Sequence, residues 1–128
     1  MNTEIRSDDA PPAFSAYAQA VATPPGVRWL SVSGQVGITP DGTLASTVEG
    51  QNEQAWNNVF ALLKAGGMAK EDIVDVLAIV TDADGVAPYR VTRDRMLDGH
   101  VCGSTMLVCG LAHPDWKVEI SVRAAKAD

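Results

Sequence analysis

The sequence predicts an α+β protein in which two amphipathic helices pack on one face of a mixed β-sheet. The order of its patterns leads to this class: β-type runs come first, then helix, strand, helix and two final strands. The helical stretches are residues 51–65 and 86–97, and the strand between them is 73–80. A length of 128 residues fits one domain with a sizeable core, so we expect residues 1–128 to form a single domain.

Extended segments open the chain. We expect a short strand at Asn2–Arg6 and a second short strand or extended segment at Phe14–Val21. Tyr17 in the second segment is either a core aromatic residue or a polar-tipped residue that faces a cleft, and composition favours the core. Val27–Ile38 is the clearest strand of the chain, because apolar and polar residues alternate along it, with Trp29 on its polar side.

A glycine, Gly34, interrupts that strand. Glycine weakens a strand, so it usually marks either a bulge or a point where another group approaches the backbone. The pattern leaves both interpretations open, a bulge without a ligand and a bulge beside one.

The middle of the chain carries the two helices and a buried strand. Apolar residues recur every three or four positions in Gln51–Ala65, and Gly66-Gly67 follows in the usual place for a left-handed cap. Ile73–Val80 is apolar on both faces except at Asp75, which predicts a central strand. Capping side chains then precede the second helix, Val86–Leu97.

The last two β-type runs are Gly103–Leu111 and Val118–Val122, joined by a loop that contains a proline. Both faces of the first run carry small or apolar residues, which predicts a strand near the middle of the sheet, and the loop predicts that the two runs pair. In the second run Glu119 projects away from its apolar neighbours. Its carboxylate must be solvated, paired or used, and a wet face of an edge strand explains it as well as a function does.

Charge and composition exclude several function classes. The net charge of −6 argues against binding nucleic acid or an anionic membrane, and no apolar run reaches the length of a bilayer span. Without a leader sequence, a cytoplasmic location is expected. Cys102 and Cys109 are expected as buried free cysteines, and His100 near Cys102 lacks a second ligand pair, so we expect no metal site. Apolar residues on the uncovered sheet face, Trp29 among them, predict self-association.

Two segments of the chain are distinctive: the strand Leu30–Val36 with its Ser-Gly-Gln sequence, and the ending Val118-Glu119-Ile120. Together with further segments that extend over nearly the whole chain, they resemble the RidA/YjgF family in content and order. The family resemblance implies a chorismate-mutase-like fold and a homotrimer with small-molecule clefts between subunits. It also implies hydrolysis of reactive enamines and imines to 2-oxo acids and ammonia, without a metal or organic cofactor.

Carried over by position, the resemblance implies a role for individual residues. Tyr17 would line the cleft, Ser33 and the backbone of Gly34 would approach the ligand, and Glu119 would orient the attacking water. An imine carbon is already electrophilic, so a carboxylate that positions water and moves a proton suits this chemistry.

The chain departs from the family where an arginine should hold the substrate carboxylate. Gly103 or, with a shift of one residue, Ser104 takes that place, just before Thr105, and Arg90 stands where the family has a helix asparagine. A charge-assisted bidentate contact is worth about 1.5–3 kcal/mol or more, so its loss would weaken binding about tenfold to more than a hundredfold.

Three functions follow from this pattern. The first is a hydrolytic deaminase whose substrate lacks the carboxylate or has it held by Arg28, Arg90 or Arg93. The second is a non-catalytic trimer that binds a small metabolite or partner in the same cleft. The third is another hydrolytic activity such as a ribonuclease, which the acidic charge disfavours.

Overall fold

The structure is a computed structural model that describes all 128 residues. Its elements are β1 (Thr3–Ile5), β2 (Ala20–Ala22), β3 (Arg28–Gln35), α1 (Val48–Ala65), η1 (Lys70–Asp72), β4 (Ile73–Val80), η2 (Ala83–Gly85), α2 (Val86–Leu97), β5 (Gly103–Val108) and β6 (Val118–Lys126). The main sheet has the order β3-β6-β4-β5, and β1 pairs with β2 in a separate antiparallel ribbon. Only β4 and β5 are parallel, so the main sheet is mixed as expected.

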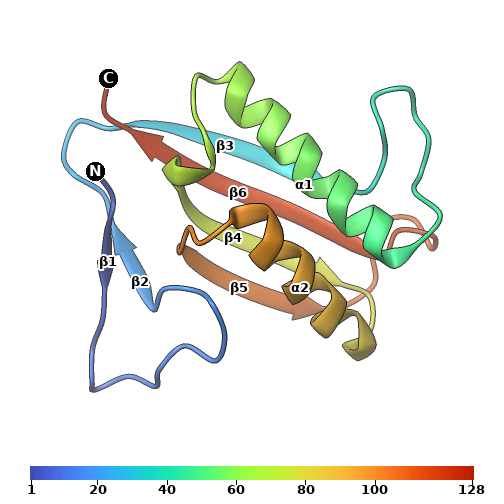
Figure 1. Ribbon diagram of the computed structural model, residues 1–128, viewed down its shortest axis with the longest axis horizontal. Coiled ribbons are helices and arrows are strands. Elements are labelled where there is room, and N and C mark those ends of the chain that lie inside the picture. Colours follow the sequence, from blue (N-terminus) through green and yellow to red (C-terminus); the bar gives the residue numbers. More distant parts are fainter.

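Both helices cover the same face of the main sheet (Figure 1). α1 contacts β3, β6 and α2, and in the view of Figure 1 α2 lies in front of β4 and β5. Trp56, Val59 and Leu63 of α1 are fully buried against Ile120 and Val122 of β6. The helical spacing of these α1 residues and the two-residue spacing in β6 thus meet in one core, which confirms the predicted α+β class.

The helix limits follow their capping residues. The Thr47 hydroxyl accepts a hydrogen bond of 3.0 Å from the Gly50 N–H, so α1 begins three residues before the predicted start. α2 ends at Asp98, whose φ of +48° is left-handed, and Gly99 continues in that region. The predicted limits of α2 are those observed.

The placement of β5 corrects the prediction that this strand lies near the middle of the sheet. β5 is an edge strand, it pairs in parallel with β4, and it does not pair with β6. Because α2 connects β4 to β5 as a crossover, the two strands must run in the same direction, and β6 then inserts between β3 and β4. The apolar second face of β5 is not covered within the chain, since Leu107 is 46% exposed there.

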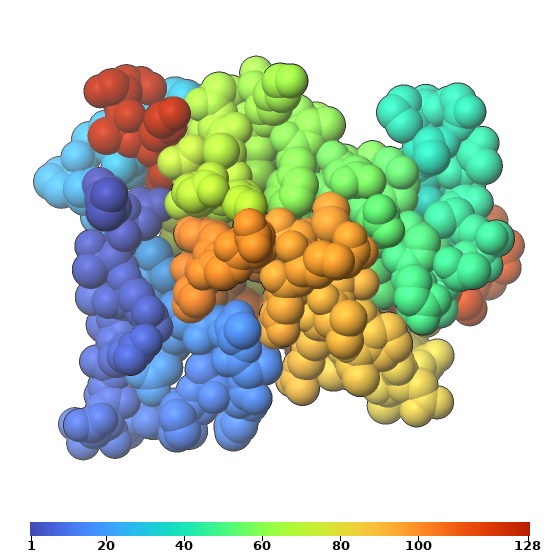
Figure 2. Space-filling model, viewed as in Figure 1, coloured from blue at the N-terminus to red at the C-terminus, as the bar shows by residue number.

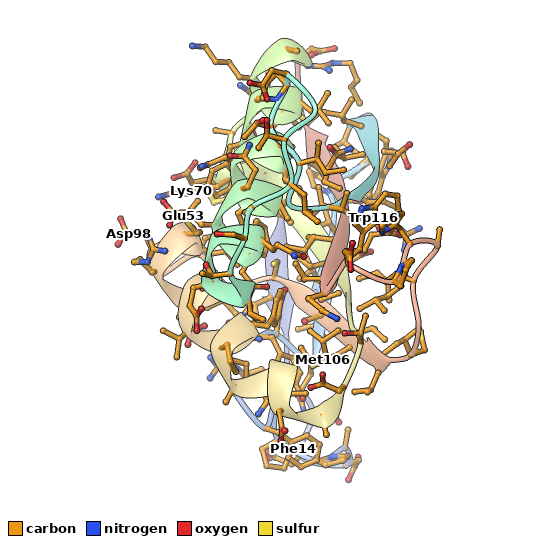
Figure 3. The ribbon with its side chains drawn as sticks, turned by 90° about the vertical axis from the view of Figure 1, so that its right-hand side faces the viewer. Phe14, Glu53, Lys70, Asp98, Met106 and Trp116 are labelled. Carbon is orange, nitrogen blue, oxygen red and sulfur yellow. The ribbon has the colours of Figure 1, made fainter.

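We call the helix-free side of the main sheet the open face. Strand register brings Trp29 and Ser31 of β3, Asp75 and Leu77 of β4, Thr105 and Leu107 of β5, and Glu119, Ser121 and Arg123 of β6 to it. Trp29 is 51% exposed there, as the sequence predicts for an uncovered face. In the edge-on view of Figure 3, Glu53, Lys70 and Asp98 lie on the opposite, helical side of the molecule.

The N-terminal segment forms a lobe beside α2 and β5 (Figure 2). It is fixed by a hydrogen bond of 2.8 Å from the Ala18 N–H to the Cys102 carbonyl, at the exposed edge that β5 would otherwise present. Tyr17 is half-buried in this lobe and does not belong to the core. Its hydroxyl accepts a hydrogen bond of 3.1 Å from the Phe14 N–H. No helix of the protein combines the length and the apolar character that a bilayer span requires.

Gln51 connects α1 to the loop that leads into β6. Its buried amide donates to the Asp115 carbonyl at 3.0 Å and accepts from the Lys117 N–H at 2.8 Å. Gln51→Leu should therefore lower the free energy of unfolding by about 1–3 kcal/mol, since it removes two part-buried hydrogen bonds to the backbone of the loop. Urea denaturation measures the loss.

Gln54→Leu is the matched control, because Gln54 lies on the same helix and bonds only to Asn58. It should cost no more than about 1 kcal/mol. Equal losses in the two variants would contradict the role of Gln51 in holding the loop.

Candidate active site

The strand β3 contains a bulge at the predicted position. Its register with β6 runs through Val32 opposite Val122 and resumes at Gln35 opposite Ile120, so Ser33 and Gly34 face a single residue of the partner strand. The extra residue turns Gly34 toward the open face, where simple alternation would have turned it toward the core. The sequence-based expectation of a bulge at Gly34 is confirmed.

The carboxylate of Glu119 occupies the space that a side chain at position 34 would need. A Cβ built on Gly34 would stand 2.5 Å from Glu119 Oε2 and 2.7 Å from its Cδ. Gly34 is not in the left-handed region, so the reason for a glycine here is space rather than backbone conformation. Gly34 and Glu119 thus form one unit: the bulge leaves a gap, and the carboxylate fills it.

Glu119 is half-buried and has no charged partner within the chain. None of the six ion pairs of the protein includes it. It lies on a central strand rather than an edge strand, flanked by the fully buried Val118 and Ile120 on the other face. Glu119 is therefore a carboxylate held in place by strand geometry, with oxygen atoms free to accept a hydrogen bond from water or a ligand.

A second group of predicted residues surrounds a hollow at the start of β5. Gly103, Ser104 and Thr105 line it together with Gln19 of the N-terminal lobe, and its volume is about 440 Å³. Asp75 and Arg123 line the same hollow from the neighbouring strands, and neither was predicted as a site residue. Alternation along β6 puts Arg123 on the same face as Glu119, but only the strand order brings it beside Gly103.

The Glu119 and Gly103 groups do not meet within one chain. Glu119 stands opposite Ile79, which is opposite Leu107, four residues beyond Gly103. At roughly 3.3 Å per residue along a strand and 4.8 Å between strands, their Cα atoms are about 16 Å apart. The structure therefore unites Gly34 with Glu119, and separately gathers Gly103, Ser104 and Thr105.

Two of the three arginines proposed to replace the missing family arginine are bound to other groups. Arg93 is buried and donates to Ser15 and Asp94, while Arg28 donates to Asp128 and to the Gly66 carbonyl. Arg90 is half-buried, and its Nε has no hydrogen-bond partner. None of these three lines the hollow at Gly103.

The two cysteines differ, which corrects the prediction that both are buried. Cys102 is buried directly before β5, and burial raises the pKa of its thiol to about 12. Cys109 is exposed directly after β5. His100 turns to the Ile73 carbonyl at 2.9 Å, and no group of three or more His, Cys, Asp or Glu side chains is arranged to hold a metal ion.

Comparison with known proteins places this chain in a family. The model of the family described as Endoribonuclease L-PSP matches residues 7–126. The chain belongs to this family. Relatives and structural neighbours show it to be the RidA/YjgF family that the Ser-Gly-Gln and Val-Glu-Ile segments resemble.

Two curated relatives illustrate the kinship. A RutC family protein of Aquifex aeolicus is 38% identical over 80 residues, which cover 62% of this chain and 62%, less than two thirds, of that protein. The 2-iminobutanoate/2-iminopropanoate deaminase of Salmonella typhimurium is 31% identical over 101 residues, which cover 78% of this chain and 77% of the enzyme.

Solved structures share the fold over almost the whole chain. A Rid family protein of unknown function from Yersinia pestis aligns with a TM-score of 0.85 at 22% identity, covering 98% of each chain. The YjgF protein of Escherichia coli aligns with a TM-score of 0.72 at 27% identity, covering 97% of this chain and 98% of that one. The chorismate-mutase-like fold expected from the sequence is thus the fold of these neighbours.

A double-mutant cycle tests the unit of Gly34 and Glu119. Gly34→Ala should lower the free energy of unfolding by about 1–3 kcal/mol, because the added methyl group collides with the carboxylate. In the Glu119→Ala background all three colliding atoms are gone, so the same substitution should cost much less. Urea denaturation of the four proteins measures the coupling; additive losses would contradict the contact.

The thiol of Cys102 should be unreactive in the native protein. In a Cys109→Ser variant we expect no reaction with a thiol reagent at pH 8, because burial and a pKa near 12 keep Cys102 protonated. Unfolding in denaturant should make one thiol per chain reactive. Rapid modification without denaturant, followed by absorbance, would show that the segment before β5 opens in the native state.

Proposed function

We propose that this protein is a cofactor-free hydrolytic deaminase of a small reactive enamine or imine. The observation that carries the proposal is the unpaired Glu119 carboxylate, held by a central strand in the gap that Gly34 leaves. The name of the Salmonella relative, 2-iminobutanoate/2-iminopropanoate deaminase, supports this chemistry.

In the proposed reaction Glu119 accepts a proton from a water molecule as the water oxygen attacks the imine carbon. The electron pair of the C=N bond moves to nitrogen, which takes up the proton from Glu119, and a tetrahedral amino alcohol results. Proton transfer from the hydroxyl to the nitrogen then lets ammonia leave, and a 2-oxo compound forms. Glu119 is regenerated, so neither an oxidant nor a reductant is needed.

The proposed site lies between two copies of the chain. A substrate with four carbon atoms is far shorter than the separation of about 16 Å between the Glu119 and Gly103 groups. Contact with both groups therefore requires the Gly103 hollow of one copy to face Glu119 of another. We propose a homotrimer built through the open face, since Trp29, Leu77 and Leu107 expose apolar surface there that a second copy would bury. Tyr17 and Ser33 would line the cleft.

A second candidate is a non-catalytic trimer that binds a small metabolite in the same cleft. The observation that favours it is Gly103 itself, which contributes no charge at the place where the family resemblance implies an arginine. The two candidates differ in one measurable property, which is turnover that depends on Glu119.

The decisive experiment follows the decay of 2-iminobutanoate, generated in situ by a dehydratase and trapped with semicarbazide. We expect micromolar wild-type protein to accelerate the decay, and Glu119→Ala to reduce kcat at least about a hundredfold by removing the general base. Arg95→Leu is a control on the helical side of the molecule, where Arg95 pairs only with Glu53, and it should match wild type. No acceleration by wild type would contradict a deaminase of this substrate and favour the binding protein.

A further inference from the structure

The hollow beside Gly103 contains one arginine, Arg123 of β6, which reaches it across β4. Arg123 is exposed, and its Nη2 donates a hydrogen bond of 2.8 Å to Asp75 Oδ2. A guanidinium has five N–H donors, so four remain available on this side chain. The rest of the lining is mixed: Gln19, Ser104 and Thr105 offer polar groups, and the remaining wall is apolar, with Val21, Val76 and Leu77 among its residues.

The absence of a side chain at Gly103 leaves space for Asp75, the hydrogen-bond partner of Arg123. A Cβ at position 103 would stand 3.3 Å from Asp75 Cβ and 3.4 Å from the Val74 carbonyl oxygen. Any side chain at this position would therefore press on the residue that orients Arg123. The glycine leaves the guanidinium accessible from the hollow.

We propose that Arg123 binds the carboxylate of a 2-imino or 2-oxo acid in the hollow beside Gly103. This proposal rests on the proposed function. The substrates in the name of the Salmonella relative, 2-iminobutanoate and 2-iminopropanoate, are small carboxylates. The planar guanidinium offers paired donors to a carboxylate while one N–H stays on Asp75. Asp75 is a positioning residue, and it also limits the net charge of the hollow, so that binding stays weak enough for product release.

Arg123 lines the hollow and is accessible to an anion, and the arginines considered above do not combine these two properties. Its guanidinium lines the hollow of Gly103 and Thr105, whereas the guanidinium of Arg93 is enclosed by the core and that of Arg28 is tied to the chain terminus at Asp128. Its single ion pair is partly exposed, with Arg123 and Asp75 side chains 64% and 35% accessible, so an anion can reach it.

The test is an NMR titration of the full chain with 2-oxobutanoate, and in parallel with its uncharged amide, 2-oxobutanamide. Arg123→Leu should weaken 2-oxobutanoate binding at least about tenfold, the loss expected for a charge-assisted pair. It should leave 2-oxobutanamide binding unchanged. Arg95→Leu removes an equally exposed, singly paired arginine of α2, and should change neither ligand.

Any of three binding results would overturn the proposal: wild type that does not bind 2-oxobutanoate, an Arg123→Leu variant that binds it normally, or an Arg123→Leu variant that loses both ligands equally. The last result would mean that Arg123 serves only the structure, and circular dichroism would report that loss independently. Binding that depends on Arg123 in a protein without imine turnover would instead leave this inference standing and refute the deaminase. Turnover that depends on Glu119 but not on Arg123 would refute this inference alone.

Discussion

The two-residue alternation along β6 is the constraint on which the rest of the structure depends. Val118, Ile120 and Val122 are buried under the helices, so Glu119 and Arg123 must project from the other face. A shift of one residue would bury both charges and expose the core, which is why the register is fixed by far more free energy than any single site contact supplies. The core thus determines where the candidate chemistry lies.

The sequence could predict the face of Glu119 and the bulge at Gly34, because both follow from local periodicity and from the properties of one residue type. It could not predict the neighbours of Glu119, because the contact between its carboxylate and Gly34 depends on the pairing of strands far apart in the chain. The helices could likewise be predicted, because the helical period of apolar residues identifies α1 and α2. Only the start of α1 differs, since the N-cap Thr47 places it before the predicted position.

The errors share one physical cause. An apolar strand face predicts a face that is covered within the chain, whereas one apolar face of β5 is left open by its own chain. The same assumption hid Arg123, which in the sequence is one polar residue of an alternating strand. Arg123 becomes a candidate ligand-binding residue only in the folded sheet, where Asp75 of β4 lies between Arg123 of β6 and Gly103 of β5. Strand order is a long-range property, so a pattern of nearest neighbours does not contain it.

The replacement of an arginine by Gly103 therefore need not remove positive charge from the hollow. In our proposal the guanidinium of Arg123 on β6 takes the place of the family arginine on β5. Arg123 is also hydrogen-bonded to Asp75. Because an ion pair holds an incoming anion less strongly than a free guanidinium does, such a site favours modest affinity and fast exchange of small carboxylates. Under the proposed function such modest affinity is an advantage, since the free energy of binding is better used in the transition state than in the ground state.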